Sequence, residues 1–571
     1  MGLINGLQVG FKQVYAGQPD QDIAALLHGI PRGQLLKVVS GLLAEQVKSI
    51  NDVKELIDFW FRDDNLGFAS DAYTRLKPIE DEFKNLSLAG APAALKLYSY
   101  ALNHLAEEKL LSDVQIEVNL FKAFLVQNDL LNLTDDKVTE TTENLEFTLR
   151  WYGLHFAQSV RFSDVVNFDL YELFISEFIR SVLLFEFLES GPETQALLKE
   201  FYKIYEVESW DQYLQQLSGV SLSILNKTNK GFLELIIPQG ENFEREVKFL
   251  DKLSSIEYDE LTDNDFKALR EKPLQKIGEG SYRIIYGLFC IERVFKGLYF
   301  NLKAVNQSLP NSAKVKDLRN LYTYKFSEQF ALYYVLNKAL PKKYLRITGE
   351  EISSAGYQGG PDFYIRNNNK AFIFESKDSL INAAIKETGN FTALLEDLKS
   401  KFYIDKTSPK AVMQLLNCII DMYKERFLTI DPSYKKEFIR IYPIVVIHDR
   451  QLDVPGFNNI LNYWFIPELQ KVSNIVDISK VKPITVVDTT TVILIHELLN
   501  SRQIMLEDAI DEYHEFVKFK KQYKSYDELM QHGHDTTLPF SFFIKQIVRT
   551  RKLKRYPEKM LKEKAFVGLG E

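Results

Sequence analysis

Cysteine is scarce in this sequence, since only Cys290 and Cys418 occur among its 571 residues. Two isolated cysteines exclude a disulfide framework and a cysteine-based zinc site, and they favour a reducing cytoplasm as the location of the chain. The sequence also lacks an apolar run of about 18 residues, so no membrane span is expected. Its first residues lack the basic stretch and the apolar core of a secretory signal peptide.

Motifs of several enzyme classes are missing as well. There is neither a G-x-S-x-G elbow nor a G-x-x-x-x-G-K-[ST] loop, so a serine hydrolase and an autonomous P-loop motor have no support. The segment IGEGSYRIIYG (277–287) is similar to a kinase glycine-rich loop, but Arg283 replaces the third glycine and no kinase catalytic loop follows. We interpret it as a hairpin. We interpret the segment HGHD (532–535) as a polar loop, because no further metal ligand lies nearby in the sequence.

Apolar and aromatic residues, by contrast, are abundant: 46% of the chain is hydrophobic and 13% is aromatic. This is a globular composition, and the length predicts about two to four domains. The net charge of -8 excludes a chain that is basic throughout, so any nucleic-acid contact must come from a local patch. The segment 545–564 has nine Lys or Arg and two Glu. It is either a contact for the phosphate backbone or a solvated helix.

The apolar spacing changes along the chain and divides it into four ranges. Residues 1–228 have apolar residues three and four positions apart and predict a helical region. Residues 229–316 predict a small connecting region that contains β-strands, and 317–500 alternate between helices and strands. Residues 501–571 predict a helical extension with a basic tail. The expected fold class is therefore multi-domain, with an α/β core whose mixed central sheet is flanked by helices.

The α/β region has a definite order of elements. Its expected elements are helices at 324–340 and 409–427 and strands at 344–352, 361–366, 370–377 and 438–449. Pro341 ends the first helix, while Ser408 and Pro409 open the second.

The stretch GGPDFYIRNNNKAFIFESKDS (359–379) places charged residues on two of these strands. With a two-residue turn at 368–369, the strands pair so that Asp362 lies opposite Glu375. Opposed side chains on one face of a hairpin have Cβ atoms roughly 5 Å apart. Lys377 lies two residues beyond Glu375 and points to the same face.

Two facing carboxylates repel each other and raise the pKa of one of them, unless a counter-charge is present. A hard divalent cation such as Mg²⁺ (or Mn²⁺) resolves this repulsion and keeps several waters. A neighbouring Lys can hold a water on the metal and offset the charge of a phosphate. Asp362, Glu375 and Lys377 thus have the chemistry of a metal-dependent phosphodiester hydrolase. The alternative is a polar edge hairpin with a surface Glu–Lys pair.

This arrangement resembles the PD-(D/E)XK nuclease superfamily, which has the restriction-endonuclease-like fold. The motif consists of Pro361-Asp362 and, after twelve further residues, Glu375-Ser376-Lys377. The resemblance implies that Asp362 and Glu375 bind the metal together with the backbone carbonyl of Ser376. Lys377 would then position or activate the attacking water.

The resemblance covers about residues 318–500 and adds two candidate site residues. Many members of the superfamily carry a further glutamate on the preceding helix, and Glu328 holds this place. Some members carry a glutamine on the helix after the motif, and Gln414 matches it. Both residues are equally compatible with an exposed helix face.

The resemblance implies a Mg²⁺-dependent nuclease that hydrolyses DNA by attack of water, with DNA favoured over RNA as the usual substrate of the superfamily. A nuclease domain joined to a large helical module resembles prokaryotic restriction and anti-phage defence effectors, in which the helical part senses a trigger or binds a partner subunit. Many such enzymes act as homodimers to cut both strands. The competing hypothesis is a catalytically inactive nucleic-acid-binding or scaffold protein that retains the fold.

Overall fold

The computed structural model describes residues 7–46, 53–83, 86–166, 168–226, 231–254, 264–521, 523, 528–530 and 533–568. Its described residues form two compact units. Unit 1 draws on residues 1–137, 165–174 and 202–298, and unit 2 on residues 138–164, 175–201 and 299–571. Across the described ranges, no helix combines the length and the apolar character that a membrane crossing needs.

The chain changes from one unit to the other after residues 137, 164, 174, 201 and 298. The units therefore have boundaries different from those of the four consecutive ranges expected from the sequence. The reason is that apolar spacing reports which face of a helix is buried, but not which distant helices share a core.

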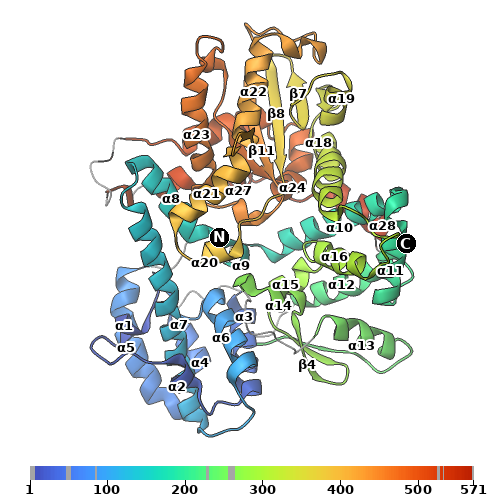
Figure 1. Ribbon diagram of the computed structural model, residues 1–571. Coiled ribbons are helices and arrows are strands. Elements are labelled where there is room, and N and C mark those ends of the chain that lie inside the picture. Colours follow the sequence, from blue (N-terminus) through green and yellow to red (C-terminus); the bar gives the residue numbers. More distant parts are fainter. Residues whose placement is uncertain are drawn as a thin grey trace. The chain divides into compact units, whose positions relative to one another are not determined.

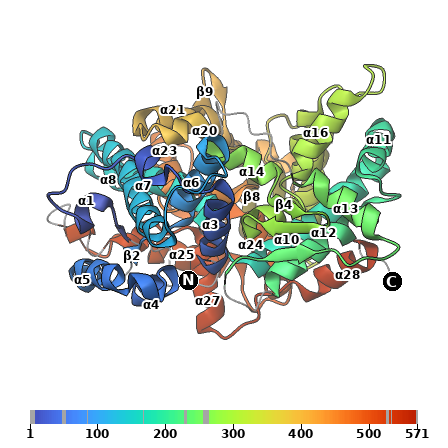
Figure 2. The same cartoon turned by 90° about the horizontal axis from the view of Figure 1, so that it is seen from below.

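Unit 1 consists mainly of helices, as the apolar spacing predicts. Figures 1 and 2 show α3 (Arg32–Gln46) and α6 (Ala91–His104) side by side. The other helices that begin in this unit are α1 (Phe11–Val14), α2 (Ile23–Leu27), α4 (Val53–Trp60), α5 (Leu66–Glu82), α7 (Asp113–Thr142), α10 (Leu170–Ser190), α12 (Trp210–Leu225), α13 (Phe243–Lys252), α14 (Lys267–Glu271), α15 (Gly287–Glu292) and α16 (Leu298–Ser308). Two short parallel strands, β1 (Leu7–Gln8) and β2 (Leu86–Ser87), complete its first part.

A small antiparallel sheet of unit 1 contains the hairpin predicted at 277–287. Its strands lie in the order β3 (Glu234–Ile236), β5 (Ser281–Ile284) and β4 (Leu274–Gly278). Arg283 on the middle strand is 8% exposed, and its guanidinium lies 2.8 Å from a carboxylate oxygen of Glu234. The buried cation is thus matched by an anion on the neighbouring strand.

Unit 2 contains the mixed sheet expected from the alternation of helices and strands. Its strands lie in the order β12 (Thr485–Asp488), β11 (Arg440–Ile447), β8 (Lys370–Lys377), β7 (Phe363–Asn367) and β6 (Leu345–Thr348). The pairs β6–β7 and β7–β8 are antiparallel, whereas β8–β11 and β11–β12 are parallel. Figure 1 shows α22 (Ala411–Tyr423) against this sheet.

Helices pack on both faces of the sheet. On the face of Ile373, α22 shares a core with α21 (Phe391–Phe402), α23 (Phe457–Lys471) and α8 (Phe147–Val160). On the opposite face, Tyr333 of α18 (Tyr333–Ala339) packs its ring 5.2 Å from that of Phe363. The other helices are α9 (Ser163–Val166), α11 (Gln195–Tyr205), α17 (Leu318–Asn320), the π-helical segment η4 (Leu321–Leu332), α19 (Gly349–Ser354), α20 (Ala383–Glu387), α24 (Thr489–Asn500), α25 (Leu506–Phe516), α27 (Phe540–Thr550) and α28 (Glu558–Gly568). The C-terminal extension is thus helical, as predicted.

Two expected elements of the α/β region are corrected. The strand predicted at 344–352 ends at Thr348, because Thr348 and Glu351 form a capping box that starts α19. The helix predicted at 409–427 begins at Ala411, because Ser408–Pro409 forms strand β10, which pairs with β9 (Ile404–Asp405).

The segment predicted as a polar loop, 532–535, is described only in part. His532 lies outside the described residues, and His534 begins the short helix η8 (His534–Thr537).

Candidate active site

The hairpin β7–β8 has the register that a two-residue turn predicts. Asn367 pairs with Lys370, and Phe363 pairs with Phe374 at the far end of the ladder. Asn368 occupies the turn with a φ of 55°, a conformation that asparagine tolerates better than most residues. The predicted register is confirmed over the whole paired length.

The expected pairing of Asp362 with Glu375 needs a correction. The backbone N–H of Asp362 donates to the carbonyl of Phe374 at 3.0 Å, although Phe374 already pairs with Phe363. Two residues of one strand thus lie against one residue of the other, as in a β-bulge. Asp362 therefore precedes the regular ladder instead of standing directly opposite Glu375.

Two further hydrogen bonds hold Asp362 in place. Its Oδ2 accepts from the backbone N–H of Ser376 at 2.6 Å, and its carbonyl accepts from the N–H of Gly349 at 2.8 Å. A Cβ atom on Gly349 would lie 3.0 Å from the carbonyl oxygen of Asp362 and 3.2 Å from the hydroxyl of Tyr333. Both distances are shorter than an ordinary van der Waals contact, so glycine allows an approach that a side chain would crowd.

Glu375 and Lys377 point to the same face, toward α22, as alternation along the strand predicts. Glu375 is 1% exposed, and the Nζ of Lys377 lies 2.6 Å from its Oε1. The same Nζ donates to Oε1 of Gln414 on α22 at 3.1 Å. The other carboxylate oxygen of Glu375, Oε2, is buried and has no hydrogen-bond partner among the described residues. The structure thus brings Gln414 to the two strand residues.

Glu328 joins this group from the π-helical segment η4, a kind of helix that is frequent at functional sites. Its pKa is raised to about 8, first by burial and then by the charge of Glu375, while Lys377 opposes the shift. The pKa of Asp362 is raised well above its ordinary value by burial and then by Glu375 and Glu328. Burial by itself would lower the pKa of Lys377, but Glu375 and Asp362 outweigh it. Three carboxylates therefore face one protonated amine.

The donor atoms fit a hard divalent cation in kind, but they do not form a closed ligand set. Within the described ranges, no three side chains of His, Cys, Asp or Glu are placed to hold a metal ion. One carboxylate oxygen of Glu375 accepts a hydrogen bond from the Nζ of Lys377, and one carboxylate oxygen of Asp362 accepts from the backbone N–H of Ser376. The buried Oε2 of Glu375 nevertheless has no partner among these residues, and a cation would satisfy this oxygen.

Three further polar side chains lie close to these residues, and their contacts were not expected from the sequence: Ser327, Asp378 and His448. Ser327 donates its hydroxyl proton to Oδ2 of Asp378 at 2.7 Å, which ties the residue before Glu328 to the residue after Lys377. His448 lies 2.8 Å from the hydroxyl of Ser376. Alternation along β8 would have placed Ser376 and Asp378 on one face. His448 lies directly after the neighbouring strand β11, and alternation along a strand does not link it to Ser376.

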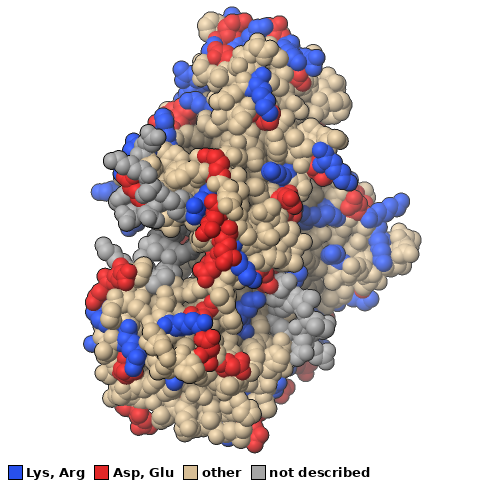
Figure 3. Space-filling view, turned by 60° about the vertical axis from the view of Figure 1, so that its left-hand side comes forward, with Lys and Arg blue, Asp and Glu red and all other residues tan. Residues whose placement is uncertain are grey.

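Charge on the surface gives limited support for a nucleic-acid contact. On the face shown in Figure 3, acidic side chains gather in one column, and Lys and Arg are scattered among other residues. In the basic segment 545–564, Lys564 lies 2.7 Å from Glu186 and Arg551 lies 3.0 Å from Glu512. Part of this segment's positive charge is therefore balanced within unit 2.

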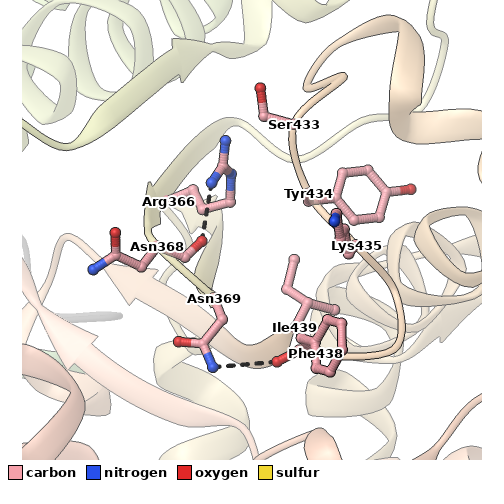
Figure 4. A pocket seen from close by; sticks show the side chains of 8 residues that line it. All are labelled: Arg366, Asn368, Asn369, Ser433, Tyr434, Lys435, Phe438 and Ile439. Carbon is pink, nitrogen blue, oxygen red and sulfur yellow. Dashed lines mark hydrogen bonds between the residues drawn. The ribbon is translucent and has the colours of Figure 1, made fainter.

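A pocket of about 250 Å³ lies at the other end of the hairpin (Figure 4). It is lined by Arg366, Asn368, Asn369, Ser433, Tyr434, Lys435, Phe438 and Ile439. Arg366 donates to the carbonyl of Asn368, and Asn369 donates to the carbonyl of Phe438. Asp362 and Asn368 flank the strand β7, which separates them by about 20 Å. The pocket is therefore distinct from the carboxylate group.

Comparisons with models of protein families, with curated proteins and with solved structures found no match to this chain. The resemblance to a nuclease superfamily consequently stays a resemblance of motif. Any function has to be argued from the geometry and the charge of these residues.

Proposed function

We propose that the chain is a metal-dependent nuclease whose active site consists of Asp362, Glu375 and Lys377. The observation that carries this proposal is the buried Oε2 of Glu375, which lies beside two further carboxylates and has no hydrogen-bond partner in the part of the chain that the structure describes. Buried like charges are costly unless a cation offsets them. Groups with strongly perturbed pKa values gather at functional sites, which supports a catalytic interpretation over a structural one.

Asp362 and Glu375, with the backbone carbonyl of Ser376, would hold Mg²⁺ or Mn²⁺. The cation would supply Lewis-acid polarisation of the phosphate and of the attacking water. Lys377 is protonated, so it donates hydrogen bonds to a phosphate oxygen or to the water and offsets their charge. Gln414 accepts from Lys377 and keeps the amine at the site.

Glu328 is suited to accept a proton during the reaction. Burial and the charge of Glu375 raise its pKa in the metal-free protein, so its carboxylate is more basic than an ordinary one. As the oxygen of water forms a bond to phosphorus, one of its protons passes to the carboxylate of Glu328. The phosphodiester bond to the leaving oxygen breaks, and that oxygen takes up a proton from solvent.

The substrate and the biological role extend this proposal. DNA is favoured over RNA by the resemblance of the motif, and the basic segment 545–564 supports contact with a phosphate backbone. The helical unit 1 would then sense a trigger or bind a partner, as in restriction or anti-phage defence. These roles rest on analogy of architecture.

A second candidate is a catalytically inactive protein that retains the arrangement. It is favoured by the short contact of 2.6 Å between Lys377 and Glu375, which occupies one of the two expected metal-binding carboxylates. In this case Lys377 stabilises the hairpin as the counter-charge of Glu375, and nucleic acid is bound without being cut.

Incubation of the purified chain with plasmid, linear and single-stranded DNA and with RNA tests the proposal. Cleavage is expected with Mg²⁺ or Mn²⁺ and not with EDTA. The variants Asp362→Ala and Lys377→Ala should lose cleavage while keeping a cooperative unfolding transition. Glu437→Gln serves as the matched control, because Glu437 is an exposed acid near the amino-terminal end of β11.

The absence of cleavage under all of these conditions, with and without cell extract as a source of an activator, would contradict the proposal. Binding of DNA without cleavage, unchanged by Asp362→Ala, would favour the inactive protein.

A further inference from the structure

The face of β8 opposite to Glu375 carries a second polar group at the same end of the strand. Ser376 and His448 are each 6% exposed, and the hydroxyl of Ser376 lies 2.8 Å from Nε2 of His448. Thr489, which is 2% exposed, lies 3.3 Å from Nδ1 of the same ring. This buried row runs from the first residue of α24 to the strand that carries Glu375.

The direction of each hydrogen bond in the row can be assigned. The hydroxyl of Thr489 lies 3.1 Å from the carbonyl of Ile447, which can only accept, so the hydroxyl proton points there. Thr489 therefore accepts from Nδ1–H of His448, which leaves Nε2 unprotonated. Nε2 in turn accepts the hydroxyl proton of Ser376. The chain of bonds fixes one tautomer of the ring.

The backbone of His448 is held as well. The guanidinium of Arg180 donates to the backbone carbonyl of His448 at 3.0 Å. His448 is therefore fixed both at its ring nitrogens and at its backbone.

Ser376 connects this row to the carboxylates on the other side. Its hydroxyl bonds to His448, and its backbone N–H donates to Oδ2 of Asp362 at 2.6 Å. We infer that His448 is a positioning residue of the active site, which orients Asp362 through Ser376. The inference rests on the proposed function, because it assigns His448 to the same site.

Four variants test the inference in the full chain. His448→Leu removes the acceptor at similar volume, and Ser376→Ala removes the donor but keeps the backbone carbonyl. His448→Gln retains an acceptor oxygen at about the reach of Nε2. His514→Leu is the matched control, because Nε2 of His514 makes the same 2.8 Å bond to a hydroxyl, that of Thr485 on β12.

The first readout is cleavage as a function of Mg²⁺ concentration. His448→Leu and Ser376→Ala should raise the half-saturating Mg²⁺ concentration about 10–100-fold and lower kcat, with KM for nucleic acid unchanged. His448→Gln should recover most of the loss, and His514→Leu should lower only the thermal stability. A normal Mg²⁺ dependence in His448→Leu would overturn the inference.

The second readout does not need activity and separates this inference from the proposed function. Hydrogen exchange of the peptide that contains Ser376 should be at least about tenfold faster in His448→Leu than in the wild type and in His514→Leu. If the wild type neither cleaves nucleic acid nor binds Mg²⁺ by calorimetry, the proposed function fails. Unchanged exchange in His448→Leu then overturns the positioning role as well, whereas faster exchange supports the orientation of Asp362 by His448.

Discussion

Two hairpins of the molecule, β4–β5 in unit 1 and β7–β8 in unit 2, each bury charged side chains. In the first, Arg283 lies 2.8 Å from Glu234, and its guanidinium also lies 4.9 Å from the ring centre of Phe232. In the second, the amine of Lys377 faces the carboxylates of Glu375, Asp362 and Glu328. A balanced buried charge stabilises a sheet, whereas we propose that the excess of carboxylates in the second hairpin serves a ligand.

The largest expected effect is on catalysis at the unbalanced hairpin. Asp362→Asn and Glu375→Gln should each lower cleavage about 10³-fold or more, because each removes a charge on which the cation depends. Arg283→Met should leave the rate of the folded protein unchanged. Cleavage rates measured at saturating Mg²⁺ on one DNA substrate check this. Equal losses of cleavage rate in all three variants would contradict the distinction between the two hairpins.

Arg283→Met and Glu375→Gln should change the stability of the protein in opposite directions. Arg283→Met leaves Glu234, whose side chain is 29% exposed, without its partner and should cost about 2 kcal/mol of unfolding free energy. Glu375→Gln should stabilise the metal-free protein at pH 8, because burial raises the pKa of Glu375 and makes its ionised form unfavourable in the folded state. Urea denaturation in EDTA measures both. A destabilised Glu375→Gln protein would mean that Lys377 fully balances this carboxylate.

A third effect concerns pH. Since the pKa of Glu328 is raised to about 8 from an ordinary value of 4.5, the folded state binds more protons than the unfolded state between these values. Metal-free stability should therefore fall as pH rises across this window, by at most about 1.4 kcal/mol per pH unit.

Glu328→Gln should flatten this dependence, and added Mg²⁺ should reduce it in the wild type. Denaturation midpoints between pH 5 and 8.5 test both statements. If stability depends on pH in the same way in the wild type and in Glu328→Gln, the ionisation of Glu328 costs the folded protein little free energy, and the prediction is wrong.

The smallest effect lies in the two turns. Gly280 in the β4–β5 turn has a φ of 65°, and a Cβ atom there would lie 2.7 Å from the ring of Phe243. Gly280→Ala should therefore cost more than the about 1–2 kcal/mol of the backbone conformation itself. Asn368→Ala should cost about 1 kcal/mol, and Asn368→Gly should be close to neutral. Thermal denaturation ranks the three variants by stability. A smaller loss of stability in Gly280→Ala than in Asn368→Ala would contradict the effect of the contact with Phe243.

Local pattern predicts much of the fold around the candidate site. The pair of asparagines at 368–369 sets the register of β7 and β8, and alternation puts Glu375 and Lys377 on one face. The long apolar spacing predicts α10 and α22, and the order of helices and strands predicts a mixed sheet. All of these depend on residues close in sequence, where turn geometry and side-chain periodicity decide the structure.

The remainder depends on contacts between distant residues. The bulge at Asp362 is accompanied by the hydrogen bond from Gly349 to its carbonyl, a contact that no alternation pattern reveals. The hydrogen bond of Ser376 to His448 joins two strands 72 residues apart. Each unit likewise consists of segments that are far apart in the sequence but pack together. The boundaries of the units therefore differ from the consecutive ranges expected from the sequence.

The chain passes repeatedly between its two units, and this limits which gene segments can recombine without disrupting the fold. The sheet of residues 299–571 is covered in part by α8, which precedes it by more than a hundred positions: Phe156 stacks on Phe457 with 5.7 Å between ring centres, and a Cβ atom on Gly456 would lie 2.3 Å from the carbonyl of Tyr152. A recombination event that moved only the gene segment for 299–571 would transfer a sheet with part of its cover missing. The two units are therefore expected to be inherited together, as one piece of coding sequence.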